Sequence, residues 1–435
     1  MSRFLTAVLL CFSVAPWLQA EPLASFDHAM NAYERGDHEP ARKAFSLMAE
    51  AGLTEAQFNL GVMLLNGQGG PTDEVDGSAW ILLAAKDEHD AARQASQILA
   101  EHLGPDRMSQ AESRLEVLAA DYGRRQLLER HSPQTCTEDC RNEPEDGLSQ
   151  WPDLQSDPEI HIRGGKPARF NLRQPSYPPN EAERGVMGAV RVGGWINEEG
   201  QIEHPHVVSA YPAGTFDRAA LRAFSQWTVD WVDGAPKEAP VYHQQEIGFV
   251  IDTEYSQTLD QHQRAAREGE QDPTAVHRFI WIIDTLDLHH RLEAPIPPET
   301  VVELTLWAAV IGVPAAQIDL ARRFHSGRGI EQDRESAVFW MMQAAMEGNA
   351  EAQFELSQYR QVGDEHRRAL SRAAAGTGMI AAVLSNIREM IAEPEKADAE
   401  YLAELLEKLP QSYQWTSDDP IMEQARRLAE SATES

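Results

Sequence analysis

Positive charge is scarce in this chain. Its 435 residues include 38 Lys and Arg against 69 Asp and Glu, which gives a formal net charge of −31. Nucleic acids and anionic lipid surfaces are bound through clustered basic side chains, so this composition argues against both as direct partners. The acidic excess favours solubility, because like-charged chains repel one another.

The motifs of common reaction centres are also missing. The sequence has no Gly-x-Ser-x-Gly elbow, no His-Glu-x-x-His helix and no phosphate-binding glycine loop. His204 and His206 would share one face of a strand, but no third metal ligand stands near them. We therefore expect no enzyme, no metal site and no cofactor. The alternative is an enzyme with an acidic cleft, built from residues such as Asp272, Asp284 and Asp287.

Long apolar runs are confined to the N-terminus. Arg3 precedes a nearly unbroken apolar run from Phe4 to Leu18, and Ala20 stands just before Glu21. A basic start, a short apolar run and a small residue before the cut are typical of a secretory signal peptide. A membrane-spanning helix needs about 20 apolar residues, more than this run supplies. We expect residues 1–20 to be removed on export; the alternative is an uncleaved membrane anchor.

Cysteine is nearly absent. Without Cys11, which lies in the predicted signal peptide, the mature chain keeps Cys136 and Cys140. An isolated pair in an oxidising compartment is expected to form a disulfide, and a metal pair is the alternative. Cβ atoms four residues apart on a helix are too distant for that bond, so 131–159 is predicted to be a linker loop.

A repeated pattern appears near both ends of the chain. The segment from Gly52 to Ala85 recurs from Gly312 to Ala345 at the same offsets. The paired positions are Ala56 and Ala316, Leu60 and Leu320, Gly67 and Gly327, Gly69 and Gly329, Asp73 and Asp333, Trp80 and Trp340, and Ala84 and Ala344. Ala and Leu four apart share one helix face, and Gly ends the helix. Such hairpins are too small to stand alone and stack into a solenoid.

These positions resemble the Sel1-like repeat, a relative of the tetratricopeptide repeat. The resemblance implies an α-solenoid whose concave face binds peptides or proteins. We expect helical repeats at 21–130 and at 301–430, with connector helices at 253–300.

Residues 160–252 follow a different pattern. Apolar and polar residues alternate on both sides of the turn signal Asn197-Glu-Glu-Gly200, which indicates a β-hairpin. A helical stretch runs from Phe216 to Trp227, and a final strand is predicted from Gln244 to Ile251. Two strands, a helix and a strand form a small α+β sandwich. The predicted fold class is therefore multidomain, with an α-solenoid at both ends around a small α+β domain.

Several residues of this block follow one another in a characteristic order: Tyr177, Pro178, Gly188, Gly200, Asp217, Arg218, Ala219, Ala220, Leu221, Trp227 and Phe249. In this order and spacing the block resembles the C-terminal domain of the TonB energy-transducer family. The resemblance implies binding of an extended segment of an outer-membrane transporter, which is added as a strand to the sheet. The chain departs from the family in having no long Pro-rich spacer and in placing this domain internally.

The resemblance also implies a candidate site, made of the last strand's edge and the Tyr-Pro segment. Its predicted partner-binding residues are Tyr177, Pro178, Gln244, Glu246, Ile247, Phe249 and Ile251. Tyr177 alternatively packs the entry loop of the domain. The sequence thus predicts a periplasmic protein-binding protein whose partner is a transporter segment or another envelope protein, with the repeats as an interaction scaffold. The alternative is a membrane-anchored TonB-type energy transducer.

Overall fold

The computed structural model describes residues 25–134, 159–162, 166–232, 234–235, 240–251, 258, 261, 263–264, 272–288, 296–359, 362–409 and 419–431. The predicted signal peptide and the Cys136–Cys140 pair lie outside these residues, so both stay predictions. None of the described helices is long and apolar enough to cross a membrane.

The N-terminal block consists of helices that follow the repeat pattern. In chain order they are α1 (Phe26–Arg35), α2 (His38–Glu50), α3 (Thr54–Asn66), α4 (Glu74–Lys86), α5 (Asp90–His102), α6 (Pro105–Tyr122) and α7 (Arg124–Arg130). Gly67 follows α3 with a positive φ of 65°, and the Asp73 side chain caps α4. Gly327 and Asp333 have the same two roles at the equivalent helices of the second block.

The C-terminal block is a longer arc of helices. They are α11 (Pro273–Thr285), α12 (Pro298–Ile311), α13 (Pro314–Ser326), α14 (Arg334–Met346), α15 (Ala350–Ser357), α16 (Asp364–Gly376), α17 (Ile380–Ala392), the 3₁₀ turn η3 (Pro394–Lys396), α18 (Ala399–Lys408) and α19 (Pro420–Ser431). Ala316, Trp340 and Ala344 are fully buried, which agrees with packing as their role.

A buried glutamine recurs at one position of three repeats. The side-chain amides of Gln57, Gln317 and Gln353 each donate to the backbone carbonyl eight residues earlier, at 3.1–3.2 Å. Each bond ties the start of one helix to the end of the preceding helix. Each of these carbonyls also accepts the N–H of the glycine three residues later, so the glutamine adds a second hydrogen bond at a helix terminus. The glutamines are therefore a structural part of the repeat that the Ala, Gly and Trp pattern did not reveal.

The two repeat blocks pack directly against each other. The Trp340 indole of α14 donates to the His131 carbonyl after α7 at 2.9 Å, and Gln343 donates to the Ala51 carbonyl at 2.9 Å. Met346 is buried in the N-terminal core, while Leu128 packs against the C-terminal core. The α+β domain is thus an insertion between two parts of one solenoid.

The inserted domain contains more strands than the sequence pattern predicted. Its elements are β1 (Glu159–Ile162), β2 (Lys166–Asn171), α8 (Pro179–Glu183), β3 (Gly188–Ile196), β4 (Ile202–Tyr211), α9 (Asp217–Phe224), β5 (Thr228–Trp231) and β6 (Val241–Phe249). A hairpin, a helix and a final strand follow in the predicted order, but the final strand runs from Val241 to Phe249 instead of from Gln244 to Ile251. The antiparallel strand orders are β1-β2-β5 and β4-β3-β6. A bridge between Gln201 and Thr228 joins the two sheets.

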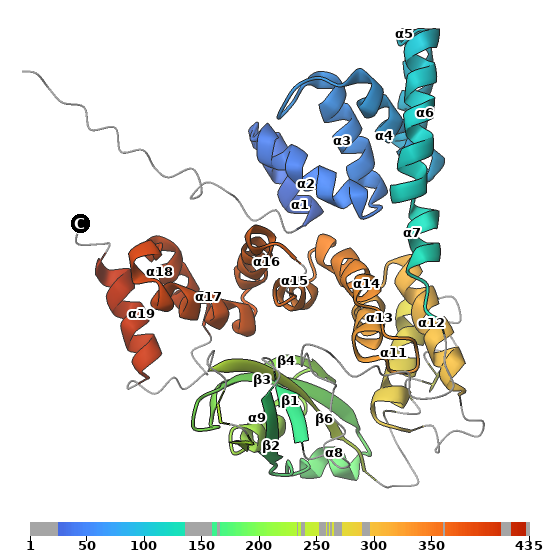
Figure 1. Cartoon of the computed structure of the whole chain (residues 1–435). Helices are drawn as coiled ribbons and strands as arrows, with labels where there is room; N and C mark the ends of the chain where they lie inside the picture. Colours follow the sequence, from blue (N-terminus) through green and yellow to red (C-terminus); the bar gives the residue numbers. More distant parts are fainter. Residues whose placement is uncertain are drawn as a thin grey trace, which may run out of the picture.

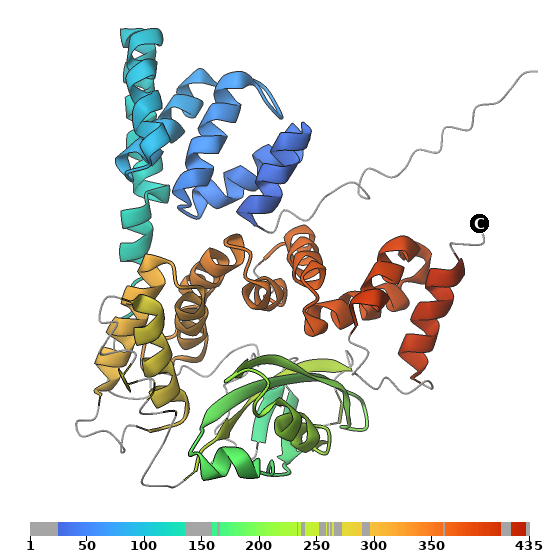
Figure 2. The same cartoon turned by 180° about the vertical axis from the view of Figure 1, so that it is seen from behind.

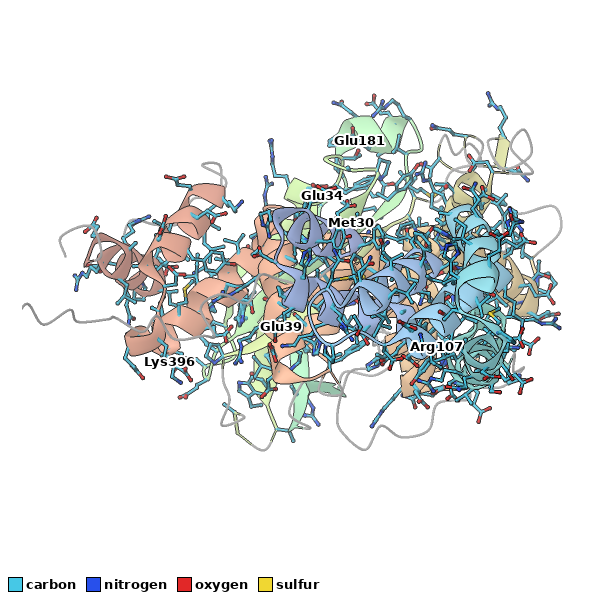
Figure 3. The ribbon with its side chains drawn as sticks, turned by 90° about the horizontal axis from the view of Figure 1, so that it is seen from above. Met30, Glu34, Glu39, Arg107, Glu181 and Lys396 are labelled. Carbon is cyan, nitrogen blue, oxygen red and sulfur yellow. The ribbon has the colours of Figure 1, made fainter. Side chains whose placement is uncertain are left out.

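One face of the β4-β3-β6 sheet packs on the domain core with α9, and the other faces the C-terminal helices. Figures 1 and 2 show the domain beneath the arc of these helices, with the N-terminal block on the opposite side of the arc. In Figure 3, seen from above, Lys396 marks the C-terminal arm, and Glu181 of α8 marks the inserted domain where it extends past the N-terminal helices. The predicted fold class, a solenoid around a small α+β domain, is confirmed.

Candidate functional site

The outer edge of β6 is the first component of the candidate site. β6 pairs with β3 along its full length, from Val241 opposite Ile196 to Phe249 opposite Gly188. Within the described part of the chain, no strand pairs with the other edge of β6. An unpaired edge presents a row of backbone donors and acceptors to any extended segment that approaches.

The hairpin turn fixes which residues of β6 point their backbone groups outward. The Asn197 N–H donates to the Gln201 carbonyl at 3.0 Å, so Asn197 directs its backbone groups toward the β4 side. Hydrogen-bonding direction alternates along an antiparallel strand, so Ile196 directs its groups toward β6 and its partner Val241. The groups of Tyr242 therefore point away from β3. Continuing the alternation, those of Gln244, Glu246 and Gly248 also point outward.

The predicted site residues fall into two sets on this strand. Gln244 and Glu246 have outward backbone groups and half-buried side chains. Ile247 and Phe249 bond to β3 through their backbone and bury their side chains in the domain core, at 7% and 2% exposure. Ile251 lies beyond the end of the strand, which stops at Phe249, and packs against the cluster that contains α11.

The Tyr-Pro segment lies beside the end of β6. The Tyr177 ring packs edge-on against Phe216 and Phe249, with centroids 5.6 and 5.9 Å apart, and its hydroxyl donates to the Val186 carbonyl at 2.5 Å. Pro178 is half-buried at the start of α8. The structure therefore gives Tyr177 a packing role at the entry of the domain and places it next to the last residue of the edge strand.

Two buried polar residues on β6 were missed by the sequence analysis. His243 and Gln245 are 6% and 4% exposed and share the core-facing side of the strand with Ile247. The His243 ring lies 5.0 Å from Phe170 of β2. Strand alternation could have revealed them. Successive side chains of a strand point to opposite faces, so His243 and Gln245 face the same side as Ile247 and Phe249.

A buried charged cluster joins the other face of the sheet to the solenoid. Arg191 of β3 bonds Glu246 of β6 at 3.1 Å and Glu351 of α15 at 3.0 Å. Arg322 of α13 bonds the same Glu351 at 2.6 Å and also pairs with Glu355. Next to this cluster, Tyr242 packs edge-on against Phe354. The concave side of the C-terminal helices is thus occupied by the protein's own sheet.

The cluster holds three carboxylates against two guanidinium groups. Burial raises the pKa of Glu355 to about 8, opposed by Arg191 and reinforced by Glu351. Burial also raises the pKa of Glu351. Both shifts favour the protonated forms of Glu351 and Glu355 in this buried cluster.

A second contact between the sheet and the solenoid involves His204 and His206, the two histidines whose spacing the sequence analysis had weighed as a metal site. His204 has a positive φ of 49° at a bulge of β4, and its Nε2 lies 2.6 Å from Asp419. His206 instead bonds the His204 carbonyl and the Tyr242 hydroxyl. The bulge gives the two rings different partners. Among the described residues, no three His, Cys, Asp or Glu side chains are grouped as a metal site requires.

Comparisons with known proteins agree with this architecture. Residues 173–251 match the family described as Gram-negative bacterial TonB protein C-terminal, and 54–89 and 314–349 match the Sel1 repeat. β1 and β2 lie before the first of these ranges. Both kinds of module mediate contacts between proteins, which supports a protein partner.

Two solved structures of repeat proteins are similar to the chain. One is c5321, a protective antigen present in uropathogenic Escherichia coli strains and displaying an SLR fold, with 16% identity, coverage of 94% of this chain and 84% of that chain, and a TM-score of 0.28. The other is a Sel1 repeat protein from Oxalobacter formigenes, with 14% identity, coverage of 88% and 84%, and a TM-score of 0.29. No curated protein matches the chain.

Proposed function

Because the chain carries a TonB C-terminal domain between Sel1 repeats, we propose that it is a periplasmic binding protein that captures an extended segment of an envelope protein. The segment adds as a strand to the outer edge of β6. The observation that supports this best is the unpaired edge itself, where Tyr242, Gln244, Glu246 and Gly248 direct their backbone groups away from β3.

The backbone of such an edge supplies affinity, and its side chains supply selectivity. Each net hydrogen bond contributes about 0.5–1.5 kcal/mol. Each of the four residues directs one donor and one acceptor outward, and the Glu246 carbonyl among these acceptors already accepts from the Gln245 side chain. Ordering a flexible segment offsets part of this gain. The most suitable partner is the N-terminal segment of an outer-membrane transporter, as the resemblance to the TonB family implies.

The solenoid supports the sheet that carries the binding edge. Its C-terminal helices hold the back of the sheet through Arg191 and Tyr242, so the edge strand is supported rather than free to distort. The rest of the repeat surface serves as the scaffold for a further protein. The absence of a Pro-rich spacer favours an exported binding protein over a membrane-anchored energy transducer, and the non-enzymatic families favour it over an enzyme.

Proline substitution at adjacent positions tests the edge. Gln244→Pro removes a donor that points outward, and edge strands tolerate proline when the missing N–H faces solvent. Gln244→Ala keeps that donor and is the matched control. Gln245→Pro removes a donor that bonds β3 and should unfold the sheet. Binding is measured by fluorescence anisotropy with labelled N-terminal peptides of outer-membrane transporters.

We expect Gln244→Pro to weaken peptide binding about fivefold or more, with a melting temperature close to that of Gln244→Ala. Equal binding by both variants would place the capture site elsewhere. The mature N-terminus, read by mass spectrometry, separates export from anchoring. A chain that begins at Glu21 supports the periplasmic protein, and one that begins at Met1 supports the anchored transducer.

A further inference from the structure

Two buried polar atoms on the edge strand have no hydrogen-bond partner among the described residues: Nε2 of His243 and Oε1 of Gln245. Both side chains are more than nine-tenths buried. A buried polar atom without a partner costs about 1–3 kcal/mol. The two atoms lie on the same face of a strand whose other edge is unpaired. A chain bound at that edge could supply the hydrogen bonds that both atoms lack.

The Gln245 amide already lies at this edge. Its Nε2 donates to the carbonyl of Glu246 at 3.0 Å, and that carbonyl is one of the outward-pointing acceptors. The side chain therefore occupies a bonding position that a backbone N–H of the captured segment, here called the guest, would take. Its Oε1 is left as an acceptor next to the same position. An incoming strand would displace the amide from Glu246 and meet both of its polar atoms.

Strand geometry determines which guest residues meet His243 and Gln245. Both residues bond to β3 through their backbone, so on the outer side they form non-hydrogen-bonded pairs. In an antiparallel ladder such pairs bring Cα atoms to about 4.5 Å, the closest cross-strand approach. The guest side chains opposite them lie two residues apart and face the domain core, beside Phe170 and Ile247.

The hydrogen-bonding chemistry of these two unpartnered atoms restricts which side chains the guest can carry opposite them. Gln245 Oε1 only accepts, so the opposite guest side chain must donate. Burial lowers the pKa of His243 to about 4, so its ring is neutral and Nε2 accepts or donates according to the tautomer. A charged guest side chain would be costly in this buried position, whereas a hydroxyl or a carboxamide satisfies both atoms.

We infer that β6 selects segments carrying Ser, Thr, Asn or Gln at two core-facing positions, i and i+2, which His243 and Gln245 recognise by hydrogen bonds. This inference rests on the proposed strand addition. It goes beyond that addition because it assigns sequence selectivity to two named side chains, at positions that would otherwise be apolar.

The test is selection from a library of end-blocked nonapeptides in which each position is Val, Leu, Ala, Ser, Thr, Asn or Gln. The full-length wild-type protein is incubated with the pool, and the bound fraction is sequenced by mass spectrometry. We expect about tenfold enrichment of hydroxyl or amide residues at two positions separated by one residue. This measurement needs no variant and so does not depend on a variant folding.

Two variants show which residues carry the selectivity. In the double variant His243→Leu, Gln245→Leu, the same two positions should shift to Val and Leu. Gln226→Leu is the matched control, because its side chain is exposed outside the edge strand and its exchange should leave the core-facing preference unchanged. Binding without a polar preference in the wild type overturns this inference and leaves strand addition intact. No binding of any peptide to the wild type overturns both.

Discussion

Arg191 and Glu351 lie 160 positions apart in the chain and 3.0 Å apart in the structure. This ion pair fixes the inserted sheet against the C-terminal helices. Arg191 is 6% exposed, and the carboxylates that pair with it come from two different parts of the chain.

Removing the guanidinium group of Arg191 should lower the free energy of unfolding strongly. Arg191→Ala removes the common partner of the partly buried carboxylates of Glu246 and Glu351, of which only Glu351 keeps a bond to Arg322 among the contacts described above. Breaking a buried ion pair costs about 3–5 kcal/mol, which is the upper bound expected here. The control is Arg184→Ala, because Arg184 pairs with Glu181 at the surface and exposed pairs contribute about 0–1 kcal/mol. The free energy of unfolding from urea titration compares the two. A similar small loss in both variants would contradict the role of Arg191.

The buried cluster should make the protein less stable as pH rises. The pKa of Glu355 is about 8 in the native state, against an ordinary value near 4.5. Between these values the native state holds a proton that the unfolded chain has released, so stability falls with increasing pH and levels off above pH 8. Glu355→Gln, which resembles the protonated side chain, should flatten this slope. The slope is measured from the free energies of unfolding of the wild type and of Glu355→Gln at pH 6 and pH 8.5.

Acid should destabilise the inserted domain for a separate reason. Burial lowers the pKa of His206 to about 4, below its ordinary value of 6.5. From pH 6.5 down to pH 4 the unfolded chain binds a proton that the native His206 does not, so the contribution of His206 to stability falls with falling pH and opposes that of Glu355. His206→Gln should reduce the slope of unfolding free energy against pH in that window by about one proton. An unchanged slope would show that His206 accepts the proton while folded.

Glycine at the hairpin turn should be far less replaceable than glycine in a nearby loop. Gly200 and Gly214 have φ values of 78° and 75°, but a Cβ at Gly200 would lie 1.8 Å from the Val229 carbonyl, while one at Gly214 meets nothing within 4 Å. Gly214→Ala should cost about 1–2 kcal/mol for the left-handed backbone. Gly200→Ala should cost about 1–3 kcal/mol more, because it also disrupts the bond from Val229 N–H to the Gly200 carbonyl. Thermal unfolding compares the pair.

The elements that sequence predicted are those whose determinants lie close together in the chain. The positions of Gly67, Asp73 and Trp80 set a helical hairpin within about thirty residues, and their copies 260 residues later do the same. The β3–β4 hairpin follows from one turn between two alternating segments. Short-range periodicity is sufficient for such elements.

The arrangement of the blocks could not be predicted in this way. The contacts Arg191–Glu351, Ser209–Glu351 and Trp340–His131 join residues 142–209 positions apart. No periodic pattern encodes such pairs. The sequence therefore predicted which strand forms the candidate site but not which of its backbone groups are free. The outward hydrogen-bonding direction of Gln244 depends on the turn geometry at Asn197 and on the register of β6 with β3.

The direct packing of the two repeat blocks limits how this protein can be divided. A fragment that ends at Arg130 lacks Met346, which fills its interior. A fragment that begins at Pro273 lacks Leu128 and the carbonyl of His131 that receives the Trp340 indole. We therefore expect either fragment made alone to expose part of its apolar core and to be less stable than the same residues in the whole chain. The inserted domain cannot be removed without cost either, because Trp195 lies in the core of the C-terminal helices.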